Sequence, residues 1–277
     1  MGTLHYKGFK FSQGSFLEVN DSLALEGPLK ISINGTIFTI TMRSPGNDEE
    51  LIRGLLYSED IYKDKTHHPV LQVTETDNLG NAIAINAIID ENKIGDKYLN
   101  KRNLLSVASC GICGKTDFDT SHPGASQIKS TMQLDPALVG KMFHRMNELQ
   151  RTFRQSGGSH AAAAFTIDGE ILSLHEDIGR HNAVDKVVGD LLLKQKLKEA
   201  KCLIVSGRIS YEIVSKCFVA GIPFLAAVSA PSSLAVDYSK ELGITLMAFC
   251  REGDLTVYSH PTKLKNNDIS NNRLKAG

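Results

Sequence analysis

The chain has 277 residues, of which 42% are hydrophobic, and 31 Lys and Arg balance 31 Asp and Glu. This length allows two domains, and the lack of a basic excess argues against nucleic acid as a partner. The sequence lacks both the run of about 18 apolar residues that a membrane span needs and the apolar stretch of a secretion signal. We therefore expect a cytoplasmic protein with no membrane partner.

Residues 1–102 predict a small α+β domain. The segment 29–42, LKISINGTIFTITM, predicts a β-hairpin because its central Asn-Gly pair suits a type I′ turn between β-branched residues. The following SPGNDEELIRGLLYSE predicts a helix with an acidic first turn and one leucine-rich face. Two more strands are expected at 70–76 and 82–89.

Residues 103–133 predict a long loop. They are rich in Ser, Gly, Asp and Thr and show little apolar periodicity after Leu105. Loops of this length are uncommon in compact domains and are usually functional or disordered. We expect this loop to be mobile without partners, and it carries the motif SCGICGK with Cys110 and Cys113.

Residues 134–277 predict an α/β domain. Its first helix, DPALVGKMFHRMNELQRTF, has an Asp-Pro start signal. Strands then alternate with helices, which predicts a largely parallel sheet closed by an antiparallel edge pair. The strands are expected near 161–167, 202–206, 223–229, 244–249 and 254–259, and the helices near 179–194, 210–220 and 232–242.

The Cys-x-x-Cys motif allows several interpretations. Structural zinc needs four ligands and only one pair exists, so we expect no bound metal. A thioredoxin-like dithiol would precede an apolar helix, which does not follow Cys113. A sulfur carrier would use a thiolate on a flexible loop, which Gly111 and Gly114 favour. The residues alone leave the carrier, the dithiol and two unremarkable surface thiols open. The remaining three cysteines are expected to be small core or edge residues.

Polar and glycine-rich motifs follow the predicted strands. Gly158 and His160 lie in SGGSHAAAAF, His181 in EDIGRHNAVDKVVG, and Gly207 and Arg208 in SGRISYEIV. Strand ends that face helix N-termini are where α/β sheets bind ligands, so we expect a shared crevice. Two simpler interpretations remain open. The glycines of SGGSHAAAAF could form a helix C-cap, and EDIGRHNAVDKVVG could be a solvated helix start with Asp177 as its N-cap. Neither a P-loop nor a Rossmann fingerprint is present.

The segment FCREGDLTVY predicts a hairpin turn at Glu252, Gly253 and Asp254. Phe249 and Arg251 precede this turn. These two side chains could contact a ring and its phosphates, because the planar guanidinium group of arginine suits phosphate.

These motifs together resemble the FdhD family of sulfur carrier proteins. The resemblance extends from EGPLKISINGTIF to REGDLTVYSHP, and SCGICGK is its most distinctive part. It implies a sulfurtransferase with a cysteine persulfide intermediate, which takes sulfur from a cysteine desulfurase. The sulfur would pass to the molybdenum or tungsten bis-molybdopterin guanine dinucleotide cofactor of formate dehydrogenase. In the family, the persulfide position corresponds to Cys110, and we expect Cys113 to be auxiliary.

The resemblance also implies a cofactor-binding stretch. It corresponds to Phe249, Cys250, Arg251, Glu252, Gly253 and Asp254, although a small or apolar residue is expected where Cys250 stands. The cofactor would be bound as a substrate, with no permanently bound cofactor. The family is dimeric, and its larger domain has a cytidine-deaminase-like α/β/α fold. Deaminase chemistry is rejected because the H-x-E and P-C-x-x-C zinc motifs are missing. The alternatives are a cofactor-binding chaperone without sulfur transfer and a dithiol oxidoreductase.

Overall fold

The computed structural model describes residues 2–95, 127–251 and 253–265, and their strands form three sheets. The cysteine-containing part of the predicted loop lies outside these residues, as do Cys110, Cys113 and Glu252. None of the helices in this described part has the length and apolarity that a membrane crossing needs.

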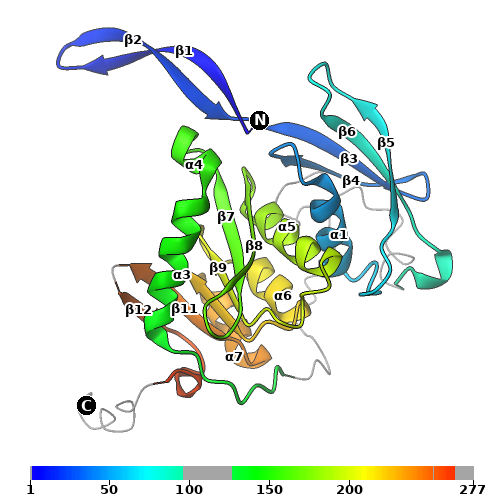
Figure 1. Cartoon of the computed structure of the whole chain (residues 1–277), viewed down its shortest axis with the longest axis vertical. Coiled ribbons are helices and arrows are strands. Elements are labelled where there is room, and N and C mark those ends of the chain that lie inside the picture. The colour runs from blue at the N-terminus through cyan, green and yellow to red at the C-terminus, as the bar shows by residue number, and fades with distance from the viewer. Residues whose placement is uncertain (1, 96–126, 252, 266–277) are drawn as a thin grey trace.

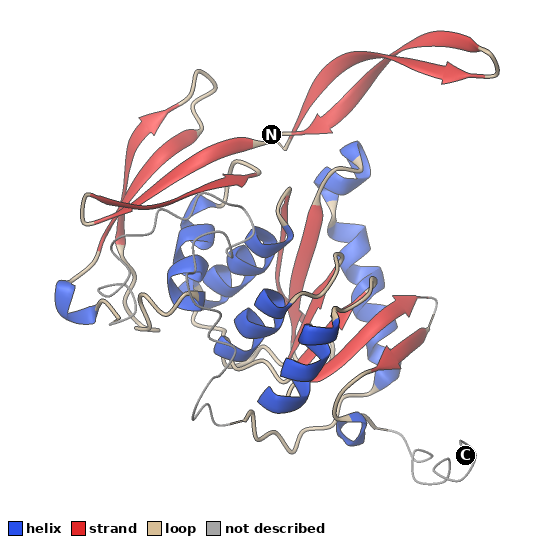
Figure 2. Cartoon of the chain, turned by 180° about the vertical axis from the view of Figure 1, so that it is seen from behind, coloured by secondary structure: helices blue, strands red, loops and turns tan. Residues whose placement is uncertain are grey.

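The N-terminal hairpin is a structure that the sequence analysis did not predict. Strands β1 (Thr3–Ser12) and β2 (Ser15–Ala24) pair only with each other. The ribbon projects from the body in both views (Figures 1 and 2). Phe9 and Leu17 are exposed on opposite faces of the ribbon, so apolar residues do not alternate cleanly with polar ones. The sequence therefore lacked the alternation that marks a strand with one buried face.

A four-stranded sheet follows, in the order β4-β3-β6-β5. Asn34 and Gly35 have φ angles of 48° and 82°, as a type I′ turn requires, which confirms the predicted hairpin. One face of the sheet packs against α1 through a core that includes Leu29, Ile31 and Leu51. The elements are β3 (Gly27–Ile33), β4 (Thr36–Arg43), α1 (Asp48–Ser58), β5 (Val70–Thr76) and β6 (Ala82–Ile88).

The third sheet has six strands in the order β12-β11-β10-β9-β7-β8. Of the neighbouring strand pairs in this sheet, only β9–β10 and β10–β11 are parallel, so the expectation of a largely parallel sheet was too strong. The reason is that β7 lies between β8 and β9 and runs antiparallel to both. The predicted antiparallel edge pair is confirmed as β11 and β12. The strands are β7 (His160–Phe165), β8 (Ile171–Asp177), β9 (Cys202–Val205), β10 (Phe224–Ala227), β11 (Thr245–Arg251) and β12 (Asp254–Val257).

Helices cover both faces of this sheet (Figure 1). Ala161 and Ala163 belong to the core under α3, whereas Ala162 and Ala164 belong to the core under the other helices, as the alternation of a strand requires. The helices are α3 (Pro136–Leu149) with the short α4 (Arg151–Ser156) after it, and on the opposite face α5 (Arg180–Leu193), α6 (Tyr211–Val219) and α7 (Ser233–Leu242). The boundaries of the two predicted domains stay a prediction.

Helices α1 and α5 join the two halves of the molecule at a pair of glycines. A Cβ atom on Gly54 would lie 1.8 Å from the carbonyl oxygen of Asp185. A Cβ atom on Gly189 would lie 1.8 Å from the carbonyl oxygen of Glu50. The two backbones are therefore in direct contact, and the crossing tolerates no side chain at either position.

Candidate functional site

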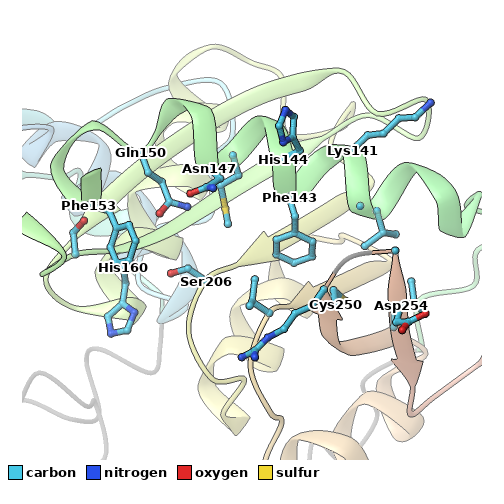
Figure 3. Close-up of a pocket in the computed structure, with 18 of the residues that line it drawn as sticks. Lys141, Phe143, His144, Asn147, Gln150, Phe153, His160, Ser206, Cys250 and Asp254 are labelled. Atoms are coloured by element: carbon cyan, nitrogen blue, oxygen red, sulfur yellow. The ribbon is translucent and has the colours of Figure 1, made fainter. Parts of the chain in front are cut away.

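A cavity of about 1170 Å³ opens at one edge of the six-stranded sheet, on the face covered by α3 (Figure 3). Ser206 and Val228 in its wall directly follow β9 and β10, and Arg251 ends β11. His160 begins β7, which runs the other way and therefore reaches the same edge. Sites for small molecules are usually about 300–1,000 Å³, so this cavity can accept a ligand of nucleotide size or larger.

The structure brings six of the predicted binding residues into the wall of this cavity. They are Gly158, His160, Cys250, Arg251, Gly253 and Asp254. Four others, Phe249, His181, Gly207 and Arg208, are not part of the wall. The sequence analysis expected these residues to share one crevice, but only part of the set lines the cavity.

The β11–β12 hairpin places its residues on opposite sides of the strand. The predicted turn is present, since Arg251 pairs with Asp254 and Gly253 has a φ of 93°. Phe249 has a φ of 53° next to a break in the strand register, and its ring is 45% exposed. A left-handed phenylalanine is a costly conformation of the kind found at ligand sites. Cys250 instead turns into the core beneath α3.

The cysteines within the described residues are all buried thiols. Burial raises the pKa of Cys250 to about 11, and it also raises the pKa values of Cys202 and Cys217. Since the thiolate is the nucleophile, these three residues stay unreactive at neutral pH. The described part of the chain also contains no group of three or more potential metal ligands.

His160 is a half-buried imidazole at the edge of the cavity. Burial lowers its pKa, and the nearby positive charges of Arg180 and Arg208 lower it further. A Cβ atom on Gly207 would lie 3.2 Å from Nδ1 of His160. Gly207 therefore allows the strand end to pack closely on the ring, although it does not line the cavity. The ring can donate and accept hydrogen bonds in its neutral form.

The structure places His181 in the interior, outside the cavity wall, and its predicted role in binding stays a prediction. The His181 ring is 8% exposed, and its Nε2 lies 3.2 Å from the hydroxyl of Ser210 and 3.8 Å from a carboxylate oxygen of Glu212. It therefore connects α5 to α6. The alternative interpretation of this motif as a solvated helix start is wrong, because the helix start is buried against the first half of the chain.

Asp177 shows the cause of this burial. It is not the N-cap of α5, which is Gly179, and its carboxylate is fully buried. The carboxylate lies 2.7 Å from Nζ of Lys186 and accepts a hydrogen bond from the backbone N–H of Ser44. Lys186 also donates to the carbonyl oxygen of Ser44. This buried pair fixes β4 to α5, and a buried charge needs such a partner.

Sequence reasoning missed one complete wall of the cavity. Helix α3 and the residues after it contribute Lys141, Phe143, Asn147, Gln150 and Phe153 (Figure 3). The sequence analysis predicted the helix α3 but assigned no binding role to its side chains. No sequence signal indicated such a role, because the β11–β12 hairpin that faces these side chains is about a hundred residues away.

The site and the fold define an α/β protein with a nucleotide-sized cavity at a sheet edge. The chain matches the FdhD/NarQ family over residues 24–265, and it belongs to this family. It is 39% identical over 253 residues to the sulfur carrier protein FdhD of Mycolicibacterium paratuberculosis, covering 88% of this chain and 92% of that protein. It is 38% identical over 261 residues to the protein of the same name from Sulfolobus acidocaldarius, covering 92% and 96%.

A solved structure has the same fold. It is the crystal structure of a protein from Desulfotalea psychrophila that is described as a formate dehydrogenase accessory protein. The TM-score is 0.73, and the match covers 95% of this chain and 99% of the other at 23% sequence identity. At this identity the likeness concerns the arrangement of the chain alone.

Proposed function

We propose that this protein is a sulfur carrier required for the maturation of formate dehydrogenase. It accepts persulfide sulfur from a cysteine desulfurase and delivers it to the molybdenum or tungsten bis-molybdopterin guanine dinucleotide, which is bound as a substrate. The observation that carries this proposal is the similarity along nearly the whole chain to proteins named sulfur carrier protein FdhD.

The cavity supports a nucleotide-bearing substrate. It lies at the strand ends where α/β sheets bind ligands, and Arg251 in its wall has a planar fork of donors suited to phosphate. Gly253 leaves room for close approach of a ligand to the backbone, since no atom lies within 4 Å of the Cβ position. Phe249 beside this hairpin exposes a ring on which a base can stack.

The thiol chemistry points to the Cys-x-x-Cys motif. The three described cysteines are buried and protonated, which leaves Cys110 and Cys113 as candidates for the carrier. A thiolate of Cys110 would attack the outer sulfur of the donor's persulfide. A new S–S bond forms on Cys110 while the donor's S–S bond breaks, and the donor leaves as a thiolate. Cys113 is assigned an auxiliary role.

We also propose the client enzyme, the cellular compartment, the oligomeric state and the fold type of the larger domain. The client is formate dehydrogenase, the protein works as a cytoplasmic homodimer, and the larger domain is of the cytidine-deaminase-like type. The support for these points is the family resemblance.

Mass spectrometry after incubation with a cysteine desulfurase and cysteine tests the proposal. We expect the intact protein to gain the mass of one sulfur atom, and Cys110→Ala to gain none. A protein that binds guanine nucleotides but never gains sulfur would instead be a cofactor chaperone. Rapid reduction of a model disulfide that requires both cysteines would indicate a dithiol oxidoreductase.

A further inference from the structure

The cavity has two chemically different ends. Lys141 and Asp254 lie at one end, and Gln150 and Ser206 lie at the other (Figure 3). Phe143 lies between them in the same view. Lys141 and Gln150 are nine positions apart, so the two ends are separated by about 13 Å along α3 at 1.5 Å per residue.

Gln150 is a buried residue whose side-chain amide faces the cavity (Figure 3). It is 4% exposed and stands at the junction between α3 and α4. Its backbone N–H donates to the carbonyl oxygen of Met146, and its carbonyl oxygen accepts from the N–H of Arg154. Both helices therefore hold it in place. Its side-chain amide, which reaches the cavity, has no hydrogen-bond partner among residues 2–95, 127–251 and 253–265.

The amide of Gln150 is accessible from the cavity. The fully buried side-chain atoms without a partner in the described residues belong to Ser58, Ser173 and Arg180, so the Gln150 amide is not among them. A ligand that enters the cavity can therefore supply the donor and the acceptor that the described residues do not.

The neighbours of Gln150 suit a flat, uncharged ring. Phe153 is 42% exposed at this end and offers an aromatic face. The hydroxyl of Ser206 accepts a hydrogen bond from the N–H of Ala161, which leaves its own proton for a ligand. Burial, and then the charges of Arg180 and Arg208, lower the pKa of His160, which favours its neutral form.

We propose that the amide of Gln150 binds the lactam edge of the 2-amino-4-oxopyrimidine ring that guanine and pterin share. A lactam presents an N–H beside a C=O, and a carboxamide presents the complementary acceptor and donor. The phosphates then lie toward the charged end, near Lys141. This inference rests on the proposed function only in that the substrate carries guanine and pterin rings.

The test is Gln150→Met, which keeps the length of the side chain and removes the amide. Titration calorimetry of the full chain compares three ligands: GDP, 6-hydroxymethylpterin and inorganic pyrophosphate. We expect at least tenfold weaker binding of GDP, of the pterin, or of both, which corresponds to about 1.4 kcal/mol or more. Pyrophosphate affinity should not change.

Two comparisons separate binding from structure. Gln155→Met is the matched control, because Gln155 lies outside the cavity wall on α4 and accepts a surface hydrogen bond from Thr3. It should change none of the three affinities. Gln150→Met should also unfold at the same temperature as the parent or higher, because it breaks no internal hydrogen bond.

The outcomes identify the ring. A loss for GDP alone places guanine beside Gln150, and a loss for the pterin alone places the pterin there. Unchanged binding of both, an equal loss for pyrophosphate, or no binding of either ring compound by the parent overturns the inference. Persulfide loading is measured separately, so a protein that loads no sulfur but needs Gln150 for ring binding would refute only the sulfur-carrier function.

Discussion

The substitution Gly54→Ala tests the helix crossing that connects the two halves of the molecule. The added methyl carbon would lie 1.8 Å from the carbonyl oxygen of Asp185 and 2.9 Å from the backbone nitrogen of Gly189. Normal contacts of this kind exceed 3 Å by a margin, so α1 and α5 must separate by more than about 1 Å. Both neighbours are backbone atoms, which cannot move aside as a side chain can.

The expected loss of stability is about 3 kcal/mol or more, at the upper end of the range for overpacked sites. For a chain of this size, that lowers the melting temperature by roughly 6–12 °C. Differential scanning calorimetry measures it. Gly140→Ala is the control, because Gly140 lies inside α3 with no atom within 4 Å of its Cβ position. It should stabilise the protein by about 0.5–1 kcal/mol. An unchanged melting temperature for Gly54→Ala would refute the close crossing.

Three further predictions concern binding, acid stability and thiol reactivity. Arg251→Ala should weaken GDP binding by about 1.5–3 kcal/mol, because it removes a charge-assisted contact. Persulfide loading on Cys110 should continue in this variant. If calorimetry shows an unchanged affinity for GDP, Arg251 does not belong to the binding site. Asp190 is buried, which opposes its ionisation, but hydrogen bonds from His175 and Lys194 outweigh this and lower its pKa to about 2. Its contribution to stability is therefore present above the unfolded pKa of about 4 and is lost as the pH falls toward 2. Asp190→Asn should accordingly lower the free energy of unfolding in urea by about 2 kcal/mol at neutral pH and by much less near pH 2. An equal loss of stability at both pH values would contradict the lowered pKa of Asp190. Cys250 should resist brief alkylation by iodoacetamide near neutral pH, since its pKa is raised to about 11, and rapid labelling seen by peptide mapping would show that the residue is accessible.

Local signals in the sequence predicted most helices and strands. Asp135 accepts a hydrogen bond from the N–H of Ala137 at the start of α3, as its Asp-Pro signal indicated. The Asn34-Gly35 turn also formed as predicted. These features depend on a few neighbouring residues, so the sequence contains all the information that they need.

Features that depend on distant partners could not be predicted in the same way. One interpretation of the sequence placed Asp177 at a solvated helix start, but Asp177 and Lys186 are buried against Ser44, which is more than 130 positions earlier in the chain. The sequence analysis assigned no role to Gln150. Its burial depends on the junction of two helices and on a cavity whose other wall comes from residues 250–255.

The candidate site was predicted in part for the same reason. Motifs at strand ends pointed to the edge of the sheet where the cavity opens, because parallel strands bring their carboxyl ends together. They did not show which face of that edge opens into a cavity, so Arg208 and His181 were grouped with Arg251. Only the packing of α3 on one face of the sheet distinguishes them.

The central claim is that Cys110 carries sulfur for formate dehydrogenase, and activation of that enzyme by cysteine variants tests it most directly. Inactive dehydrogenase is matured with parent protein, Cys110→Ala or Cys113→Ala, and persulfide occupancy is measured by mass spectrometry on the same samples. We predict that Cys110→Ala folds, holds no persulfide and gives no activation. Cys113→Ala should still load persulfide, in keeping with an auxiliary role. Full activation by Cys110→Ala would contradict the account.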